Sequence, residues 1–142
     1  MANTRTVPDI RPRVLLAARP DARVPFRHAI NGDAEVIEAG TMADAIARLN
    51  GKAPIHLVCC TLFFDESRMF DLLRQVRADE RYRHKPVVCV ASQRFDTPIS
   101  LQGLEIATRA LAASAFIDFA RHGDYDAGNA AIRSVVERFL GD

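Results

Sequence analysis

The chain has 142 residues, of which 49% are apolar and 26% charged, as is ordinary for one globular domain. Its net charge of +1 gives no reason to expect nucleic acid or an anionic membrane as a partner. No apolar stretch reaches membrane-spanning length and no signal-peptide hydrophobic region stands at the N-terminus. The three cysteines lie in apolar runs and fit a reducing cytosol best, so we expect a cytoplasmic protein.

Short apolar runs alternate with amphipathic segments after an N-terminal tail, residues 1–12, which has two prolines and no periodicity. Five of the runs are predicted to be strands. They cover residues 13–18, 34–39, 56–61, 86–91 and 116–119.

Each predicted strand is followed by a segment with helical signals. Pro25 fits the first turn of a helix that runs to residue 30, and Thr41 is a predicted N-cap. Thr97 and Pro98 open a fourth helix, and the last one begins near Asp124 or Asp126. Apolar side chains with helical spacing mark the buried faces of the second to fifth helices: Met42, Ala45, Ile46, Leu49; Met69, Phe70, Leu73, Val76; Leu101, Leu104, Ala107, Leu111; Ile132, Val135, Val136, Phe139.

This alternation predicts an α/β fold, because parallel strands need crossover helices and right-handed crossovers cover both faces of the sheet. The run 56–61 is apolar on both faces, which is typical of a central strand. We predict a doubly wound five-stranded parallel sheet in the flavodoxin-like order 2-1-3-4-5, formed by one domain, residues 13–142. Ligands of such sheets bind at the carboxyl ends of the strands.

The segment LLRQVRADERYRHKPVV resembles the third helix and fourth strand of response-regulator receiver (CheY-like) domains, and the likeness covers nearly the whole chain after Arg13. Receivers carry acidic residues after the first strand to hold magnesium and a phosphoacceptor aspartate after the third. They carry Thr or Ser after the fourth strand, and Lys followed by Pro after the fifth. The resemblance implies a signalling domain that works through protein partners.

This sequence departs from the receiver pattern at the residues that carry its chemistry. The matching positions, which we call the degenerate phosphorylation pocket, are Ala17, Ala18, Arg19, Thr61, Ala91, Ser92 and Phe119. Aspartyl phosphorylation needs a carboxylate nucleophile and a divalent cation held by hard oxygen ligands. We therefore expect no catalytic residue, no bound metal and no cofactor. Thr61 is either a phosphorylation site itself or a structural hydroxyl at the end of a strand, and we prefer the second interpretation.

Two further features of the strand ends have alternative interpretations. Asp65 and Glu66 either reach into the pocket or are solvated loop acids that favour the N-terminus of the next helix, and we prefer the second. Arg19 either pairs with one of these acids as a built-in cation or points to solvent. The basic run from Arg77 to Lys85 is interrupted by acids, so we interpret it as a solvated loop rather than a nucleic-acid patch.

The three cysteines, Cys59, Cys60 and Cys89, lie in apolar runs and form no C-x-x-C motif. Thiols in such runs behave as small hydrophobic side chains. We predict that all three are reduced and at least partly buried on adjacent central strands.

The segment between Ala91 and Ala112 is several residues longer than in a typical receiver. Receivers usually contact partners through their fourth helix, fifth strand and fifth helix. The predicted interaction face here comprises Phe95, Ile99, Leu101, Arg133 and Glu137.

The sequence thus favours a stand-alone, atypical receiver, or pseudo-receiver, that signals by phosphate-independent protein contacts. Its partner is expected to be a kinase, another regulator or a second copy of the chain in a homodimer. The alternative is a small flavodoxin-like enzyme or ligand-binding protein. That function would use Thr61, Asp65, Ser92 and Arg121. A deep pocket with a convergent charged pair would indicate it.

Overall fold

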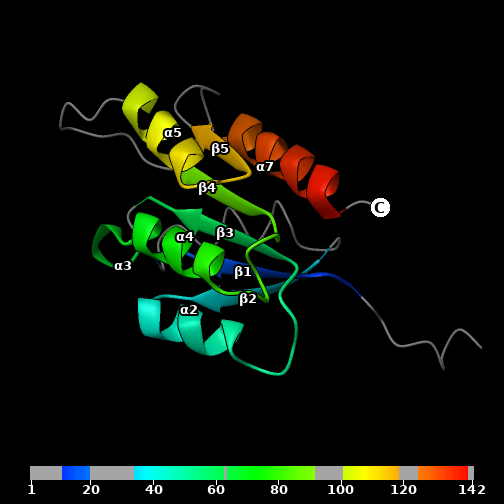
Figure 1. Ribbon diagram of the computed structural model, residues 1–142. Helices are drawn as coiled ribbons and strands as arrows, with labels where there is room; N and C mark the ends of the chain where they lie inside the picture. The colour runs from blue at the N-terminus through cyan, green and yellow to red at the C-terminus, as the bar shows by residue number, and fades with distance from the viewer. Residues whose placement is uncertain (1–10, 20–33, 63, 92–100, 119–124, 141–142) are drawn as a thin grey trace, which may run out of the picture.

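The predicted sheet is present in the computed structural model, which describes residues 11–19, 34–62, 64–91, 101–118 and 125–140. Five parallel strands lie in the order β2-β1-β3-β4-β5 (Figure 1). They are β1 (Arg13–Ala17), β2 (Glu35–Ala39), β3 (Leu57–Thr61), β4 (Val87–Ala91) and β5 (Ala115–Asp118). The flavodoxin-like order is confirmed, and each strand lies within one residue of its predicted limits.

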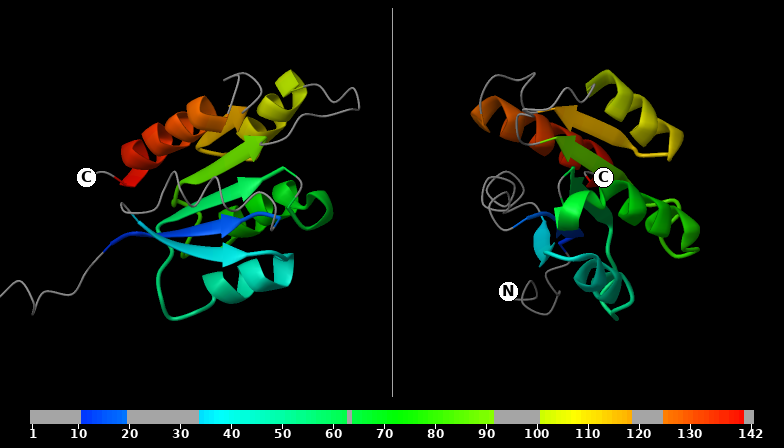
Figure 2. Two further views of the ribbon diagram at one scale, coloured as in Figure 1. Left: turned by 180° about the vertical axis from the view of Figure 1, so that it is seen from behind. Right: turned by 90° about the vertical axis from the view of Figure 1, so that its left-hand side faces the viewer.

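The helices cover the sheet on both faces. They are α2 (Met42–Leu49), the short α3 (Phe64–Ser67), α4 (Met69–Ala78), α5 (Leu101–Ala110) and α7 (Tyr125–Leu140). In the right-hand view of Figure 2, α7 lies on one side of the sheet and α2, α4 and α5 lie on the other. The sequence did not predict α3. The helix predicted from Pro25, and the beginning of the one predicted from Thr97, lie outside the described residues.

The core has two parts because β3 is buried on both faces. Its Val58 and Cys60 pack with α2 and α4, whereas Leu57 and Cys59 pack against the side covered by α7. Burying both faces of a central parallel strand removes a continuous apolar run from water, which is the main stabilising contribution in such folds. The cysteine prediction is confirmed, since Cys59, Cys60 and Cys89 are free and buried, the latter two as register partners on β3 and β4.

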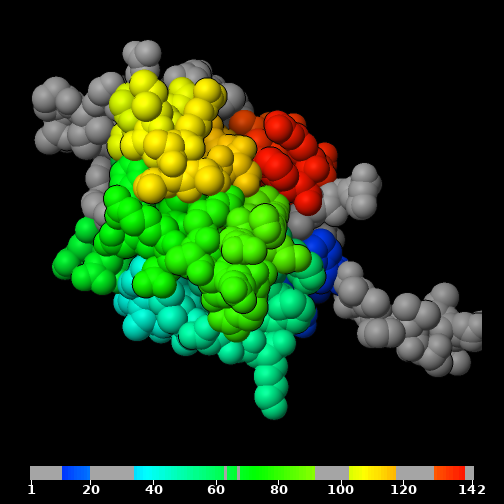
Figure 3. All heavy atoms as spheres, viewed as in Figure 1, coloured from blue at the N-terminus to red at the C-terminus, as the bar shows by residue number. Residues whose placement is uncertain are grey.

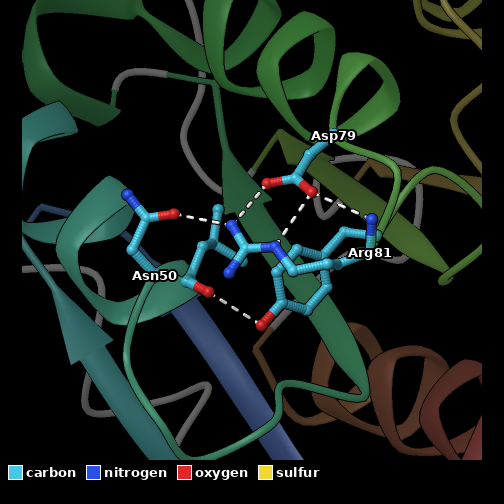
Figure 4. A network of polar contacts seen from close by, with 5 residues as sticks. Asn50, Asp79 and Arg81 are labelled. Carbon is cyan, nitrogen blue, oxygen red and sulfur yellow. Dashed lines mark hydrogen bonds and ion pairs between the residues drawn. The ribbon is translucent and has the colours of Figure 1, made fainter.

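The connection between α4 and β4 anchors the end of α2. The Arg81 guanidinium lies between the Asp79 carboxylate, at 2.7 Å, and the side-chain oxygen of Asn50, at 2.6 Å (Figure 4). The buried Tyr82 hydroxyl donates to the Leu49 carbonyl at 2.8 Å. The Tyr82 bond satisfies one of the last carbonyls of α2, which have no helical partner, and the Arg81 bond holds the side chain of Asn50, the C-cap residue of α2.

Arg77 joins the C-terminal half of α4 to the turn that leads into β5. Its Nε and Nη2 donate to the Ala112 carbonyl at 2.9 and 2.8 Å, and its Nη1 donates to the carbonyls of Arg83 and Lys85 at 3.0 and 2.6 Å. The same side chain reaches the Ser114 hydroxyl at 3.4 Å. The interpretation of the basic run as solvated is therefore wrong for Arg77, whose guanidinium is a fixed link between two connections.

Candidate functional site

The carboxyl ends of β1, β3 and β4 meet at one edge of the sheet, where parallel α/β proteins bind their ligands. Ala17 and Ala18 at the end of β1 are fully buried, as is Ala91 at the end of β4, whereas Arg19 is exposed. Ser92 and Phe119, the other members of the degenerate phosphorylation pocket, lie outside the described residues.

Thr61, the last residue of β3, is almost completely buried, with 2% of its surface exposed. Its Oγ1 donates a long hydrogen bond, 3.5 Å, to the carbonyl oxygen of Ala17 on the neighbouring strand. A buried hydroxyl is costly to leave unpaired, so this bond gives Thr61 a structural role. The strands on either side of β3 end in alanines, Ala17 on β1 and Ala91 on β4, whose side chains are methyl groups.

Asp65 has a role that neither interpretation of the sequence anticipated. Its Oδ2 accepts a hydrogen bond of 2.7 Å from the backbone amide of Met42, the first residue of α2. The Thr41 hydroxyl accepts from the Asp44 amide in the same turn at 3.1 Å, which confirms the predicted N-cap. A carboxylate beside the N-terminus of a helix is stabilised by the helix dipole.

The short α3, which carries Asp65, has an unusual backbone, because Asp65 and Glu66 within it are not helical. Asp65 and Glu66 both have positive φ angles, 42° and 57°. L-residues other than asparagine and aspartate seldom adopt this region, at a cost of about 1–2 kcal/mol each. The preferred interpretation of Asp65 as a solvated acid that favours the next helix is wrong, because its carboxylate caps the preceding one. Glu66 is exposed, as that interpretation expects.

No local pattern in the sequence could have indicated the bond between Asp65 and Met42, because 23 residues separate them. The contact exists only because the sheet places the end of β3 beside the start of α2. Of the residues in the alternative enzyme site, Ser92 and Arg121 lie outside the described residues. Thr61 and Asp65 each bond to a different backbone group rather than to one another.

The buried thiols near this edge offer no ready nucleophile. Burial raises the pKa of Cys59 and of Cys89 to about 12, and it raises the pKa of Cys60 well above its usual value. Because the thiolate is the reactive form, these groups are unreactive at neutral pH. In the described part of the chain, no three His, Cys, Asp or Glu side chains gather as a metal-binding group.

A second candidate site lies at the opposite edge of the sheet from β2, between α5, β5 and α7. A groove of about 350 Å³ there is lined by residues of all three elements and of the preceding turn: Glu105, Thr108, Arg109, Ala113, Ser114, Ala115, Phe116, Ile117, Val135 and Arg138. In Figure 3 the surface of this region runs from the yellow atoms of α5, across β5, to the red atoms of α7. We call it the β5 groove.

Only two residues of the predicted interaction face, Arg133 and Glu137, have side chains in the described part of the chain. Arg133 and Glu137 are exposed on α7, but neither lines the groove. Phe95 and Ile99 lie outside the described residues, as does the side chain of Leu101. Ile106 on α5 is a large apolar residue with 61% of its surface exposed, and the sequence analysis did not single it out. Ile106 does not belong to the helically spaced residues Leu101, Leu104, Ala107 and Leu111, which were predicted to form the buried face of this helix.

Comparison with known proteins places this fold. No protein-family model matches the sequence, and no curated protein is similar to it at a significant level. Among the described residues, no helix has both the length and the apolarity needed to cross a lipid bilayer.

Solved structures of response regulators are similar over almost the whole chain. The phosphorylated cyanobacterial phytochrome response regulator RcpA has a TM-score of 0.73 at 15% identity, covering 92% of this chain and 94% of its own. A response regulator from Hahella chejuensis has a TM-score of 0.73 at 17% identity, with coverages of 91% and 95%. The chemotaxis response regulator CheY4 of Vibrio cholerae has a TM-score of 0.69 at 16% identity, with coverages of 92% and 99%. The chain has the fold of a receiver domain, as its sequence predicted.

Proposed function

We propose that this protein is a degenerate receiver, a cytoplasmic signalling module that acts through protein contacts and without phosphorylation. The observation that carries the proposal is the state of Thr61. The resemblance aligns it with the phosphoacceptor aspartate of receivers, and it is a buried residue whose hydroxyl donates to the Ala17 carbonyl.

The residues around Thr61 support this proposal. A phosphoryl group brings two negative charges, which a receiver neutralises with a divalent cation held by carboxylates. Ala17 and Ala18, which the resemblance aligns with those acids, are buried alanines at the end of β1. Asp65, the acid that comes nearest in sequence after Thr61, is bonded to the Met42 amide of α2. RcpA was solved in a phosphorylated form, so the same fold supports that chemistry when it has the residues for it.

If the strand ends perform no chemistry, the protein has to signal through contacts made by its surface. The face formed by α5, β5 and α7 is the best supported part of that surface. It combines the exposed apolar side chain of Ile106 with the β5 groove and the charged residues Arg133 and Glu137 of α7. Contiguous exposed apolar patches commonly mark interaction sites, and Ile106 contributes one apolar side chain to this face. The partner is a kinase, another regulator or a second copy, which would form a symmetric dimer.

Two measurements test this function. Intact mass after treatment with acetyl phosphate and Mg²⁺ should show no covalent phosphate, and a stoichiometric gain that Thr61→Ala abolishes would contradict the proposal. Ile106→Asp should weaken self-association in sedimentation or capture of a purified kinase or regulator. Ala47→Asp, an exposed position on α2, is the matched control and should change neither. Equal behaviour of the two folded variants would remove the α5–β5–α7 face from consideration.

A further inference from the structure

We propose that the β5 groove binds an extended, acidic segment of a partner protein, which adds to β5 as a sixth strand of the sheet. This inference rests on the proposed function, because it specifies which kind of partner segment the α5–β5–α7 face accepts. Three features of the described residues carry it: the open edge of β5, the two helices beside it, and the charge of the groove.

The outer edge of β5 presents backbone groups in a pattern that a strand can use. Among the described residues, β5 is the last strand of the sheet and is paired with β4 alone. The amides of Val58 and Leu62 on β3 donate to the carbonyls of Pro86 and Val90, so the residues of β4 that face β5 are Val87, Cys89 and Ala91. In the parallel register that pairs Val88 with Ala115 and Val90 with Ile117, the N–H and C=O groups of Ala115 and Ile117 point toward β4, and those of Phe116 point away from it. A strand edge of this kind is a template for an added strand.

The groove has the shape for one extended chain. Its floor runs beside five consecutive residues, 113–117, and its walls come from Glu105, Thr108 and Arg109 of α5 and from Val135 and Arg138 of α7. Figure 2 shows β5 between these two helices. Paired strands lie about 4.8 Å apart, whereas a helix is about 10–12 Å wide and has its backbone groups already paired. An added strand therefore makes better use of this edge than an added helix does.

The same walls argue against a second copy of the chain as the occupant. Its β5 would carry its own α5 and α7, and these helices would collide with their counterparts before the two β5 edges came within about 4.8 Å of one another. A partner segment without flanking helices has no such obstacle.

Charge defines the chemistry of the segment. The groove is lined by two arginines, Arg109 and Arg138, and by one carboxylate, Glu105, which bonds to Arg109 at 3.0 Å. One positive charge is left over, on the α7 wall. Guanidinium groups bind carboxylates in paired, charge-assisted hydrogen bonds. An acidic side chain of the partner is therefore expected to face Arg138.

The two faces of the added strand then differ. Side chains of a strand alternate between its faces, so residues that face α7 alternate with residues that face α5. Phe116 packs with the core on the α5 side and is partly exposed there. The segment that fits best has acidic residues at alternate positions, toward Arg138, and apolar residues between them, toward Phe116.

Peptide titration of the full chain tests this inference. The probe is a fluorescent eight-residue peptide in which glutamate and valine alternate, and its counterpart has lysine in place of glutamate. Two further peptides carry N-methyl groups, one on the glutamate amides and one on the valine amides. In an added strand, only one of these two sets of amides faces β5, so N-methylation should abolish binding in one peptide and spare it in the other.

The acidic peptide should bind and the lysine peptide should not. Arg138→Glu should weaken binding at least about tenfold, because it turns an attraction into a repulsion. Arg48→Glu reverses an exposed charge on α2, away from the groove, and should leave binding unchanged. If circular dichroism shows that Arg138→Glu does not fold, Arg138→Gln replaces it in the titration and should show an intermediate loss of peptide affinity.

Absence of saturable binding of the acidic peptide up to about 1 mM would overturn the inference. Equal binding by the folded Arg138 variants, or equal binding of both N-methylated peptides, would do the same. These failures differ from failure of the proposed function. If the peptide does not bind but Ile106→Asp still weakens partner capture or self-association, the face acts by another mode of contact. If Ile106→Asp also has no effect, the proposed function fails with the inference.

Discussion

Replacing Arg77 with methionine should destabilise the protein far more than a typical surface substitution. Methionine keeps most of the aliphatic length but removes the four bonds to the carbonyls of Ala112, Arg83 and Lys85. Hydrogen bonds from a charged group contribute about 1.5–3 kcal/mol each when buried. The Arg77 side chain is only partly buried, so water replaces some of them, and we expect a loss of about 2–4 kcal/mol in the free energy of unfolding.

Urea unfolding followed by circular dichroism measures this loss, and Arg74→Met is the matched control. Arg74 lies on the same helix, but it is exposed and its ion pair with Asp71 is a surface one, so its loss should cost less than about 1 kcal/mol. The midpoint for Arg77→Met should fall while the slope m stays constant. Equal midpoints for the two variants would refute the assignment of Arg77 as a link between the α4–β4 and α5–β5 connections.

Three other changes test separate parts of the structure. Asp65→Ala should lower the free energy of unfolding by about 0.5–2 kcal/mol, as for loss of a helix cap, and the absence of any loss would contradict the bond to the Met42 amide. The His56 Nδ1 accepts a hydrogen bond of 2.9 Å from the Arg13 amide, and burial, with the nearby charges of Lys85 and Arg13, lowers its pKa below 6.5. The unfolded chain therefore takes up this proton first as pH falls below about 6.5, so stability should fall there, and His56→Asn should flatten that part of the curve in urea titrations. The three cysteines should resist a thiol reagent at pH 7.5 until the protein unfolds, and rapid labelling of the native protein would argue against their burial.

The sheet could be predicted from the sequence because its signals are local. Each strand is a short apolar run, and each crossover helix has a periodic apolar face, so the order of the elements restricts the topology to few choices. The buried positions of Cys59, Cys60 and Cys89 followed for the same reason, as did the N-cap at Thr41.

The contacts that define the candidate sites could not be predicted from the sequence because they join segments that are distant along the chain. The Asp65 carboxylate meets the Met42 amide, and the Arg77 guanidinium meets the Ala112 carbonyl 35 residues away. A single sequence shows that these residues are polar, but it does not show which backbone group each will meet. The β5 groove was missed for a related reason, since its walls belong to two helices whose approach depends on the whole sheet.

The most direct test of the central claim, that this receiver fold acts without phosphate, is a comparison of amide spectra. A ¹H–¹⁵N correlation spectrum of the full chain should be the same before and after addition of acetyl phosphate with Mg²⁺. Thr61→Ala should behave likewise, because the Thr61 hydroxyl serves the Ala17 carbonyl and not a phosphoryl group. Shifts of amides at the end of β3 together with amides of α5, β5 and α7, absent from Thr61→Ala, would contradict the claim.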